Sequence, residues 1–144
     1  MLLNIFAEPV TKVLKQRTSQ KQSTTYKMSL STQAEEFRTA YEVSNSTSNR
    51  TMQQALIAEE FKEFLAACRN EPYENELKEL ADLVYVGFQY ASNMGWDLEE
   101  ALDRVHKSNM SKLGLDGKAI RRADGKVLKG PNYKPPILND LINV

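Results

Sequence analysis

Two pairs of acidic residues in the middle of the chain have the types and the spacing that could hold a metal ion. Glu60 and Glu63 form the first pair, and Glu79 and Asp82 form the second. Each pair lies inside an apolar pattern with a helical period, so its two carboxylates fall on neighbouring turns of one helix face. A short link that contains Pro72 separates the two patterns. It favours an antiparallel helical hairpin in which all four carboxylates meet.

The surroundings of these acids indicate what they would bind. On a helical wheel Glu60 falls between Leu56 and Phe64, within the apolar stripe, and the sequence shows no Lys or Arg on the acidic faces. Carboxylates in a core are costly unless they are paired or bound to a cation. Oxygen-only ligands suit Mg²⁺, with Mn²⁺ as a substitute. The alternative is that the acids of the first helix, Glu59 included, form a solvated face.

A later helix carries two further polar residues within its apolar stripe. Asn109 lies in the middle of that stripe, and Lys112 lies beside Val105. Polar groups that project into a core with four carboxylates indicate a bound anion or base. The alternative is a buried Asn that bonds to the backbone and a Lys whose ammonium reaches solvent.

The elements that must position these residues are predicted to be helices. Capping boxes at Thr32 and Thr51 and an N-cap at Asp97 mark helix starts, while Gly95 and Gly114 mark helix ends. The expected helices run from about Thr32 to before Ser44, from Thr51 to about Arg69, from about Tyr73 to Met94, and from Asp97 to Gly114.

After Gly114 the pattern changes from helical periodicity to turns and prolines. Asp124-Gly125 is a hairpin signal, and three prolines hold the following tail extended. We expect this basic segment to lie over a neighbouring subunit or the mouth of the site. The predicted fold is an all-α four-helix bundle with a C-terminal hairpin and extended tail, and it is oligomeric. Its parts are a partly disordered N-terminal extension (1–30), a helical domain (31–115) and the basic tail (116–144).

Composition excludes several classes of protein. The chain has 144 residues and a formal net charge of zero, so no overall field favours nucleic acid or a membrane surface. An acidic centre is followed by a basic segment, which suits either a metal site beside a polyanion site or a self-complementary surface. Cys68 is the only cysteine and lies on an apolar stripe, so we expect it in the core of a cytoplasmic protein.

Taken together, these motifs resemble those of the MazG-like all-α nucleoside triphosphate pyrophosphohydrolases. The resemblance covers about residues 32 to 115, and the tail is similar to that of small single-domain members from bacteria and phages. That superfamily includes the dimeric dUTPases and the phosphoribosyl-ATP pyrophosphohydrolases. The matching residues are Glu59, Glu60 and Glu63, then Glu79 and Asp82, then Asn109 and Lys112.

The resemblance implies hydrolysis of a nucleoside triphosphate between its α- and β-phosphates, with dGTP or GTP as the candidate substrates. It implies that Glu60, Glu63, Glu79 and Asp82 hold magnesium, and that Glu59 or Glu60 is the general base toward the attacking water. Asn109 and Lys112 would contact phosphate or sugar, with Arg121, Lys126 and Tyr133 at the mouth of the site. It also implies a homodimer or tetramer in the cytoplasm, which is the host cytoplasm for a phage-encoded protein.

Two other classes of function fit the same residues. The first is a non-catalytic regulator that binds a nucleotide or metal and keeps the fold without turnover. The second is a homo-oligomeric bundle whose acids pair with the basic tail of a partner subunit. Metal or water beside the acids would favour an enzyme or a regulator, whereas Arg and Lys beside them would favour the bundle.

Overall fold

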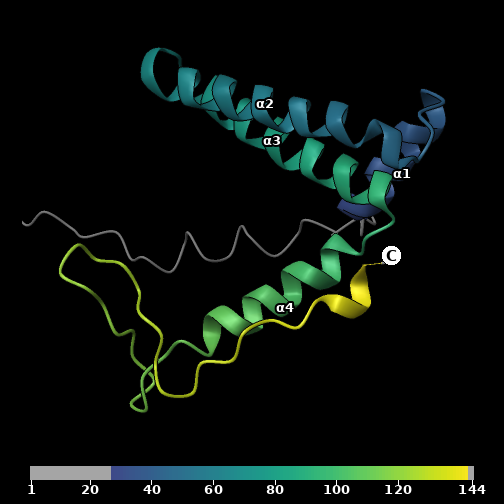
Figure 1. Ribbon diagram of the computed structural model, residues 1–144. Coiled ribbons are helices and arrows are strands. Elements are labelled where there is room, and N and C mark those ends of the chain that lie inside the picture. The colour runs from purple at the N-terminus through teal and green to yellow at the C-terminus, as the bar shows by residue number, and fades with distance from the viewer. Residues whose placement is uncertain (1–26, 143–144) are drawn as a thin grey trace, which may run out of the picture.

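The computed structural model describes residues 27–142 and consists of helices joined by irregular segments (Figure 1). The helices are α1 (Leu30–Ala40), α2 (Arg50–Asn70), α3 (Tyr73–Met94) and α4 (Leu98–Met110), with short 3₁₀ helices η2 (Thr47–Asn49) and η3 (Asn139–Leu141). Within residues 27–142 no β-strand forms. The all-α prediction is therefore confirmed. The predicted disordered extension lies almost wholly outside the described residues.

The long helices α2 and α3 form the predicted antiparallel hairpin, and their mutual contact is the largest between any two elements (Figure 1). Glu71 and Pro72 make the link, and Pro72 is the N-cap of α3. At the other end Gly95 adopts φ 68°, a left-handed conformation that suits glycine, and its N–H bonds to the carbonyls of Ala91 and Ser92. The bounds predicted for α3 and its glycine cap are confirmed.

Two predicted helix starts are wrong by a few residues. The N-cap of α1 is Ser29 rather than Thr32, and the Ser29 side chain accepts a hydrogen bond from the N–H of Thr32. Helix α2 begins at Arg50 rather than Thr51, directly after η2, with no side-chain cap. At α1 a Ser upstream of the capping box provides the side-chain cap, whereas at α2 the chain enters the helix directly from η2.

Helix α1 crosses one end of the hairpin and is attached to it by a buried polar network. The guanidinium of Arg38 donates to Asn45 Oδ1 at 2.6 Å, to the Ser44 carbonyl at 2.9 Å and to Asn93 Oδ1 at 3.0 Å. All of these acceptors are neutral. Burial lowers the pKa of Arg38. The network fixes the loop after α1 against the C-terminal half of α3.

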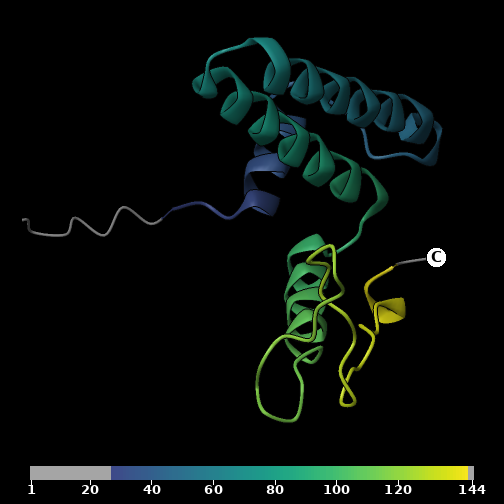
Figure 2. The same cartoon turned by 90° about the vertical axis from the view of Figure 1, so that its left-hand side faces the viewer.

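Helix α4 points away from the hairpin, and its contacts with other helices are with α1 and η3 (Figures 1 and 2). The predicted N-cap at Asp97 is confirmed, because its carboxylate accepts from the N–H of Glu100 at 2.9 Å. The predicted end at Gly114 is wrong. Helix α4 stops at Met110, and a turn at Ser111 and Lys112 follows before the chain reaches Gly114.

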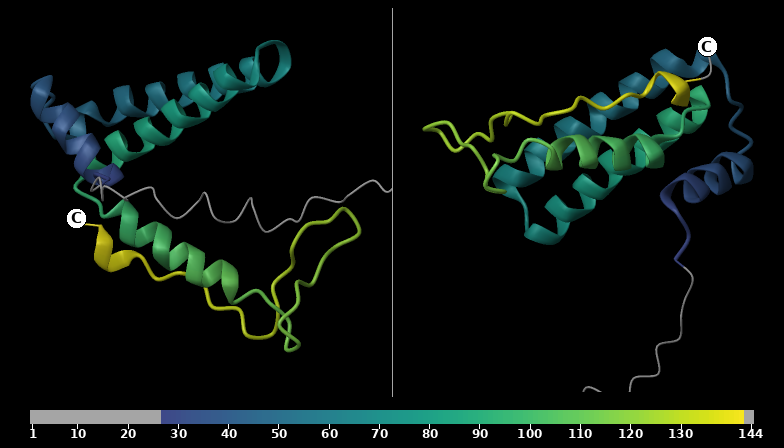
Figure 3. Two further views of the ribbon diagram at one scale, coloured as in Figure 1. Left: turned by 180° about the vertical axis from the view of Figure 1, so that it is seen from behind. Right: turned by 90° about the horizontal axis from the view of Figure 1, so that it is seen from below.

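The C-terminal segment runs back along α4 of its own chain (Figure 3). Within this chain it does not line the cavity beside the acids, and the expectation that it lies over a neighbouring subunit or the mouth of the site stays a prediction. The Gly130 N–H donates to the Lys112 carbonyl at 2.9 Å, and Ser108 Oγ donates to the Lys134 carbonyl at 2.8 Å. Arg104 on α4 also forms a bidentate ion pair with Asp140 near the end of this segment. The hairpin turn at Asp124-Gly125 forms, held by one bridge between Arg121 and Val127.

Much apolar surface on the hairpin is uncovered. Phe61 is 48% exposed and Leu80 is 43% exposed. The thiol residue Cys68 is also exposed, so the prediction that it lies in the core is wrong for the single chain. The physical reason is the position of α4, which leaves α2 and α3 with a partner along only part of their length. Among the described residues, no helix is long and apolar enough to cross a membrane.

Candidate functional site

Three of the four predicted metal ligands come together between α2 and α3. One carboxylate oxygen each of Glu60, Glu79 and Asp82 lies within 4.8 Å of the others. The hairpin produces this geometry, because Glu60 faces α3 from the middle of α2 while Glu79 and Asp82 occupy adjacent turns of α3. Cross-helix convergence of these three acids is as the sequence predicts.

The oxygens of this cluster are incompletely satisfied. The Glu79 side chain is only 13% exposed, and its Oε2 is buried without a hydrogen-bond partner. Partial burial and then the charges of Glu63, Asp82 and Glu79 raise the pKa of Glu60. A cation would satisfy the orphaned oxygen and reverse this repulsion.

Lys78 is a residue that the sequence analysis missed. Its ammonium lies 2.9 Å from Glu79 Oε1 and 2.8 Å from Asp82 Oδ2. The hydrogen bond to Asp82, followed by that to Glu79, raises the pKa of Lys78. The expectation that no Lys or Arg accompanies the acids is therefore wrong. The i,i+4 spacing of Lys78 and Asp82 is the signal that could have found it.

Glu59 and Glu63 lie at the margin of the cluster. Both are exposed, and neither belongs to the group of three converging oxygens. Glu63 is nevertheless close enough for its charge to raise the pKa of Glu60. On one chain it is therefore a neighbour of the cluster and not one of its converging ligands.

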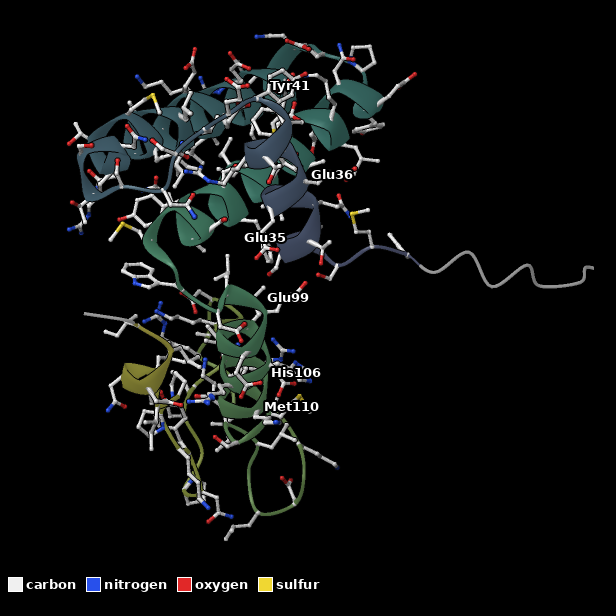
Figure 4. The ribbon with its side chains drawn as sticks, turned by 90° about the vertical axis from the view of Figure 1, so that its right-hand side faces the viewer. Glu35, Glu36, Tyr41, Glu99, His106 and Met110 are labelled. Atoms are coloured by element: carbon white, nitrogen blue, oxygen red, sulfur yellow. The ribbon has the colours of Figure 1, made fainter. Side chains whose placement is uncertain are left out.

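The structure does not bring Asn109 and Lys112 to the acids of the same chain. Asn109 is exposed, and its Oδ1 accepts a hydrogen bond from Lys112 Nζ at 2.7 Å. The expectation that both project into the acidic core is wrong for the single chain, because α4 points away from the hairpin (Figure 2). On α4, Glu99, His106 and Met110 lie along one side of the helix (Figure 4), and His106 is exposed as a surface residue.

The three tail candidates also bond within their own segment. Arg121 donates to the Gly125 carbonyl at 2.9 Å, and the backbone N–H of Lys126 donates to Asp124 Oδ1. The ammonium of Lys129 lies 4.4 Å from the centre of the Tyr133 ring. None of Arg121, Lys126 and Tyr133 lines the cavity next to the acidic cluster.

That cavity was not foreseen. It has a volume of about 340 Å³ and shares Glu60 and Asp82 with the cluster, and α1 and α2 contribute Phe37, Arg38 and Gln53. Gln53 is a second residue that the sequence analysis missed. It lies one or two turns before Leu56 and Glu60 on the same helix face, so it is a polar residue in an apolar stripe, as Glu60 is.

The donor set decides which cation fits. The acceptors that converge are all carboxylate oxygens, at least one of them lacks a partner, and the Asp82 side chain is 43% exposed to water. These are properties of sites for hard divalent cations, which keep several waters and take few protein ligands. The residues therefore fit a divalent metal ion, and Lys78 occupies the position of a counter-charge in its absence.

Comparison with known proteins agrees with this chemistry. The model of the phosphoribosyl-ATP pyrophosphohydrolase family matches residues 7–109, which is well over half of the chain and includes all three clustered acids. The match also takes in most of the segment before α1. No individual curated protein matches the chain. The chain therefore belongs to the phosphoribosyl-ATP pyrophosphohydrolase family, within the MazG-like all-α nucleoside triphosphate pyrophosphohydrolases, and is a pyrophosphohydrolase.

Proposed function

We propose that the protein hydrolyses a nucleoside triphosphate between the α- and β-phosphates, with magnesium, to a nucleoside monophosphate and pyrophosphate. The observation that carries this proposal is the convergence of Glu60, Glu79 and Asp82, with a buried oxygen of Glu79 left without a partner. A triphosphate brings its own negative charge to this acidic site, so it binds there only together with cations.

The roles of the acids follow from their positions. Glu60, Glu79 and Asp82 hold the cation, and Glu63 joins them from the margin of the cluster. When bound, a divalent cation supplies positive charge that binds the triphosphate and offsets the charge on the leaving pyrophosphate. Glu59 or Glu60 accepts the proton of the attacking water.

Lys78 is placed to serve both the acids and the substrate. Its ammonium neutralises part of the charge on Glu79 and Asp82, and its side chain is 62% exposed. Glu79 and Asp82 would hold the cation, and Lys78 beside them would contact a phosphate as a point charge.

A second copy of the chain completes the site. The apolar surface of α2 and α3 that includes Phe61 and Leu80 suits burial against another hairpin, in a homodimer or a tetramer. In such an assembly α4 of the second copy brings Asn109 and Lys112 to the phosphates. Arg121, Lys126 and Tyr133, which share a segment with α4, would then lie at the mouth of the site.

Two candidate substrates follow from different observations. Resemblance to small phage proteins favours dGTP or GTP. The matching family is named for phosphoribosyl-ATP, so this nucleotide is the second candidate. Both have the same bond to be cleaved, and the identity of the base decides between them.

The test is a panel of natural and deoxy nucleoside triphosphates and phosphoribosyl-ATP, with magnesium, assayed for products. Equal amounts of monophosphate and pyrophosphate are expected from the preferred substrate. Diphosphate and orthophosphate as first products would show that the bond assignment is wrong. Nucleotide binding with no product from any member of the panel would favour the non-catalytic regulator.

A further inference from the structure

A cavity adjoins the acidic cluster and contains a buried polar side chain without a partner. Glu60 and Asp82 form one end of the cavity, and Phe37, Leu56 and Tyr85 contribute apolar walls. Gln53 also lines it and is only 3% exposed. Its Oε1 is buried with no hydrogen-bond partner among the described residues.

An orphaned acceptor of this kind is unfavourable in the free protein. Buried amide oxygens almost always accept a hydrogen bond. An oxygen that is buried without one loses its hydration and gains no partner in return, which costs free energy. Leucine at this position would fill similar space without the cost. The cost is recovered if a ligand brings an N–H donor into the cavity, so the orphan points to the chemistry of a ligand.

The cavity is placed for a nucleobase. Its acidic end is the cation site, where the proposed function puts the triphosphate, and two aromatic rings form part of its apolar wall. The rings of Phe37 and Tyr85 meet edge to face, with centroids 5.9 Å apart. Aromatic side chains contact the face of any base, so they do not discriminate between bases. A polar group at the edge of the base forms hydrogen bonds that depend on where the base carries its N–H groups.

We propose that Gln53 is a specificity-determining residue whose Oε1 accepts a hydrogen bond from an N–H on the edge of the substrate base. The inference rests on the proposed function, because it needs the triphosphate at the acidic cluster. The long contacts of Arg38 beside the cavity, at 3.5 Å to the carbonyl and side-chain oxygens of Gln89, leave that guanidinium able to donate to an acceptor on the same base.

The substrate class follows from the donor that Gln53 needs. The base must carry a free N–H on its edge, so methylation that removes this N–H should weaken binding. The loss of one hydrogen bond, together with an acceptor left buried, corresponds to about a tenfold or larger drop in affinity.

The experiment measures binding rather than turnover. Calorimetry with magnesium and the α,β-methylene triphosphates of the four bases identifies the base that the wild-type protein prefers. Affinity is then compared with the analogue of that base whose edge N–H groups are methylated. The variants are Gln53→Leu and, as a matched control, Gln54→Leu, the exposed neighbour on the same helix.

The expected result has two parts. Wild type and Gln54→Leu should bind the preferred nucleotide at least tenfold more tightly than its methylated analogue, while Gln53→Leu binds both with similar, weaker affinity. Leucine has a volume close to that of glutamine, so a purely steric effect of the methyl groups would persist in the variant. The Tm of Gln53→Leu without nucleotide should equal or exceed that of wild type.

Three results would overturn the inference. One is unchanged base discrimination in Gln53→Leu, and a second is the absence of binding of any nucleotide to the wild type at millimolar concentration. A loss of folding by Gln53→Leu would also overturn it, because the side chain would then have a structural partner, such as a second copy. Release of pyrophosphate by the wild-type protein tests the proposed function separately, so each proposal can fail while the other holds.

Discussion

Replacement of Glu79 by Gln should separate two properties of the acidic cluster, the repulsion among its carboxylates and its binding of magnesium. Glu79→Gln keeps the shape of the side chain and removes one of three charges whose oxygens lie within 4.8 Å of one another. In the cation-free protein this change relieves repulsion, and in the presence of magnesium it removes a ligand. We therefore expect opposite effects on stability in the two conditions.

The magnitude follows from the distances. Two unit charges about 4.8 Å apart repel by roughly 3.5 kcal/mol at an effective dielectric constant of about 20. The ion pairs with Lys78 and the 43% exposure of the Asp82 side chain reduce the net effect to about 1 kcal/mol. For a chain of 144 residues this raises the cation-free Tm by roughly 4 °C.

Magnesium should act in the other direction. At a concentration about 100-fold above its Kd, a cation that binds only the folded state stabilises wild type by about 2.7 kcal/mol, or roughly 10 °C. Loss of a ligand lowers metal affinity by at least about tenfold to hundredfold, which leaves a gain of roughly 0.4–1.4 kcal/mol at the same concentration.

The assay is thermal unfolding of wild type and Glu79→Gln, each with chelator and with magnesium. Glu36→Gln is the control, since Glu36 is an exposed acid of α1 (Figure 4). It should leave both Tm values within about 1 °C of wild type, as for most surface substitutions. An equal gain from magnesium in wild type and Glu79→Gln, or a lower cation-free Tm in the variant, would refute the reasoning.

Three further predictions concern the tail and the assembly. The ion pair with Arg104 lowers the pKa of Asp140, so its contribution to holding the tail is present above about pH 4 and is lost as the pH falls through the lowered pKa. Asp140→Asn should therefore reduce, at neutral pH, the protection of the tail amides relative to their intrinsic exchange rates, and equal protection in both proteins at that pH would contradict this. A methyl group at Gly130 would lie 2.7 Å from the carbonyl oxygen of Lys112. Gly130→Ala should therefore lower the free energy of unfolding by about 1–3 kcal/mol. An unchanged denaturation midpoint would argue against that close approach. If α4 of a second copy completes the site, a mixture of inactive Glu79→Gln and inactive Asn109→Leu proteins, refolded together, should recover part of the wild-type pyrophosphate release, whereas sites built from one chain would stay inactive.

The sequence by itself determined the helical hairpin and its acids. Glu60, Glu79 and Asp82 could be placed on facing sides of two helices because helical periodicity is local and Pro72 and Gly95 mark where the second helix begins and ends. The same local rules located the N-cap at Asp97. They were less reliable at the start of α1, where Ser29 and Thr32 are both good caps and the preceding chain selects the first.

The tertiary structure alone decided which polar groups meet. Lys78 pairs with both acids of α3 by contacts local to that helix, and what the tertiary structure adds is Glu60 of α2, which brings a third carboxylate beside them. The sequence predicts a buried Asn109 because it lies within an apolar stripe. The stripe does not indicate which element covers that side of the helix, and α4 is directed away from the hairpin. Gln53 became significant only when α1 closed the cavity over it. Periodicity fixes which side of a helix is apolar, whereas the contacts of that side depend on the direction in which the next helix leaves the turn.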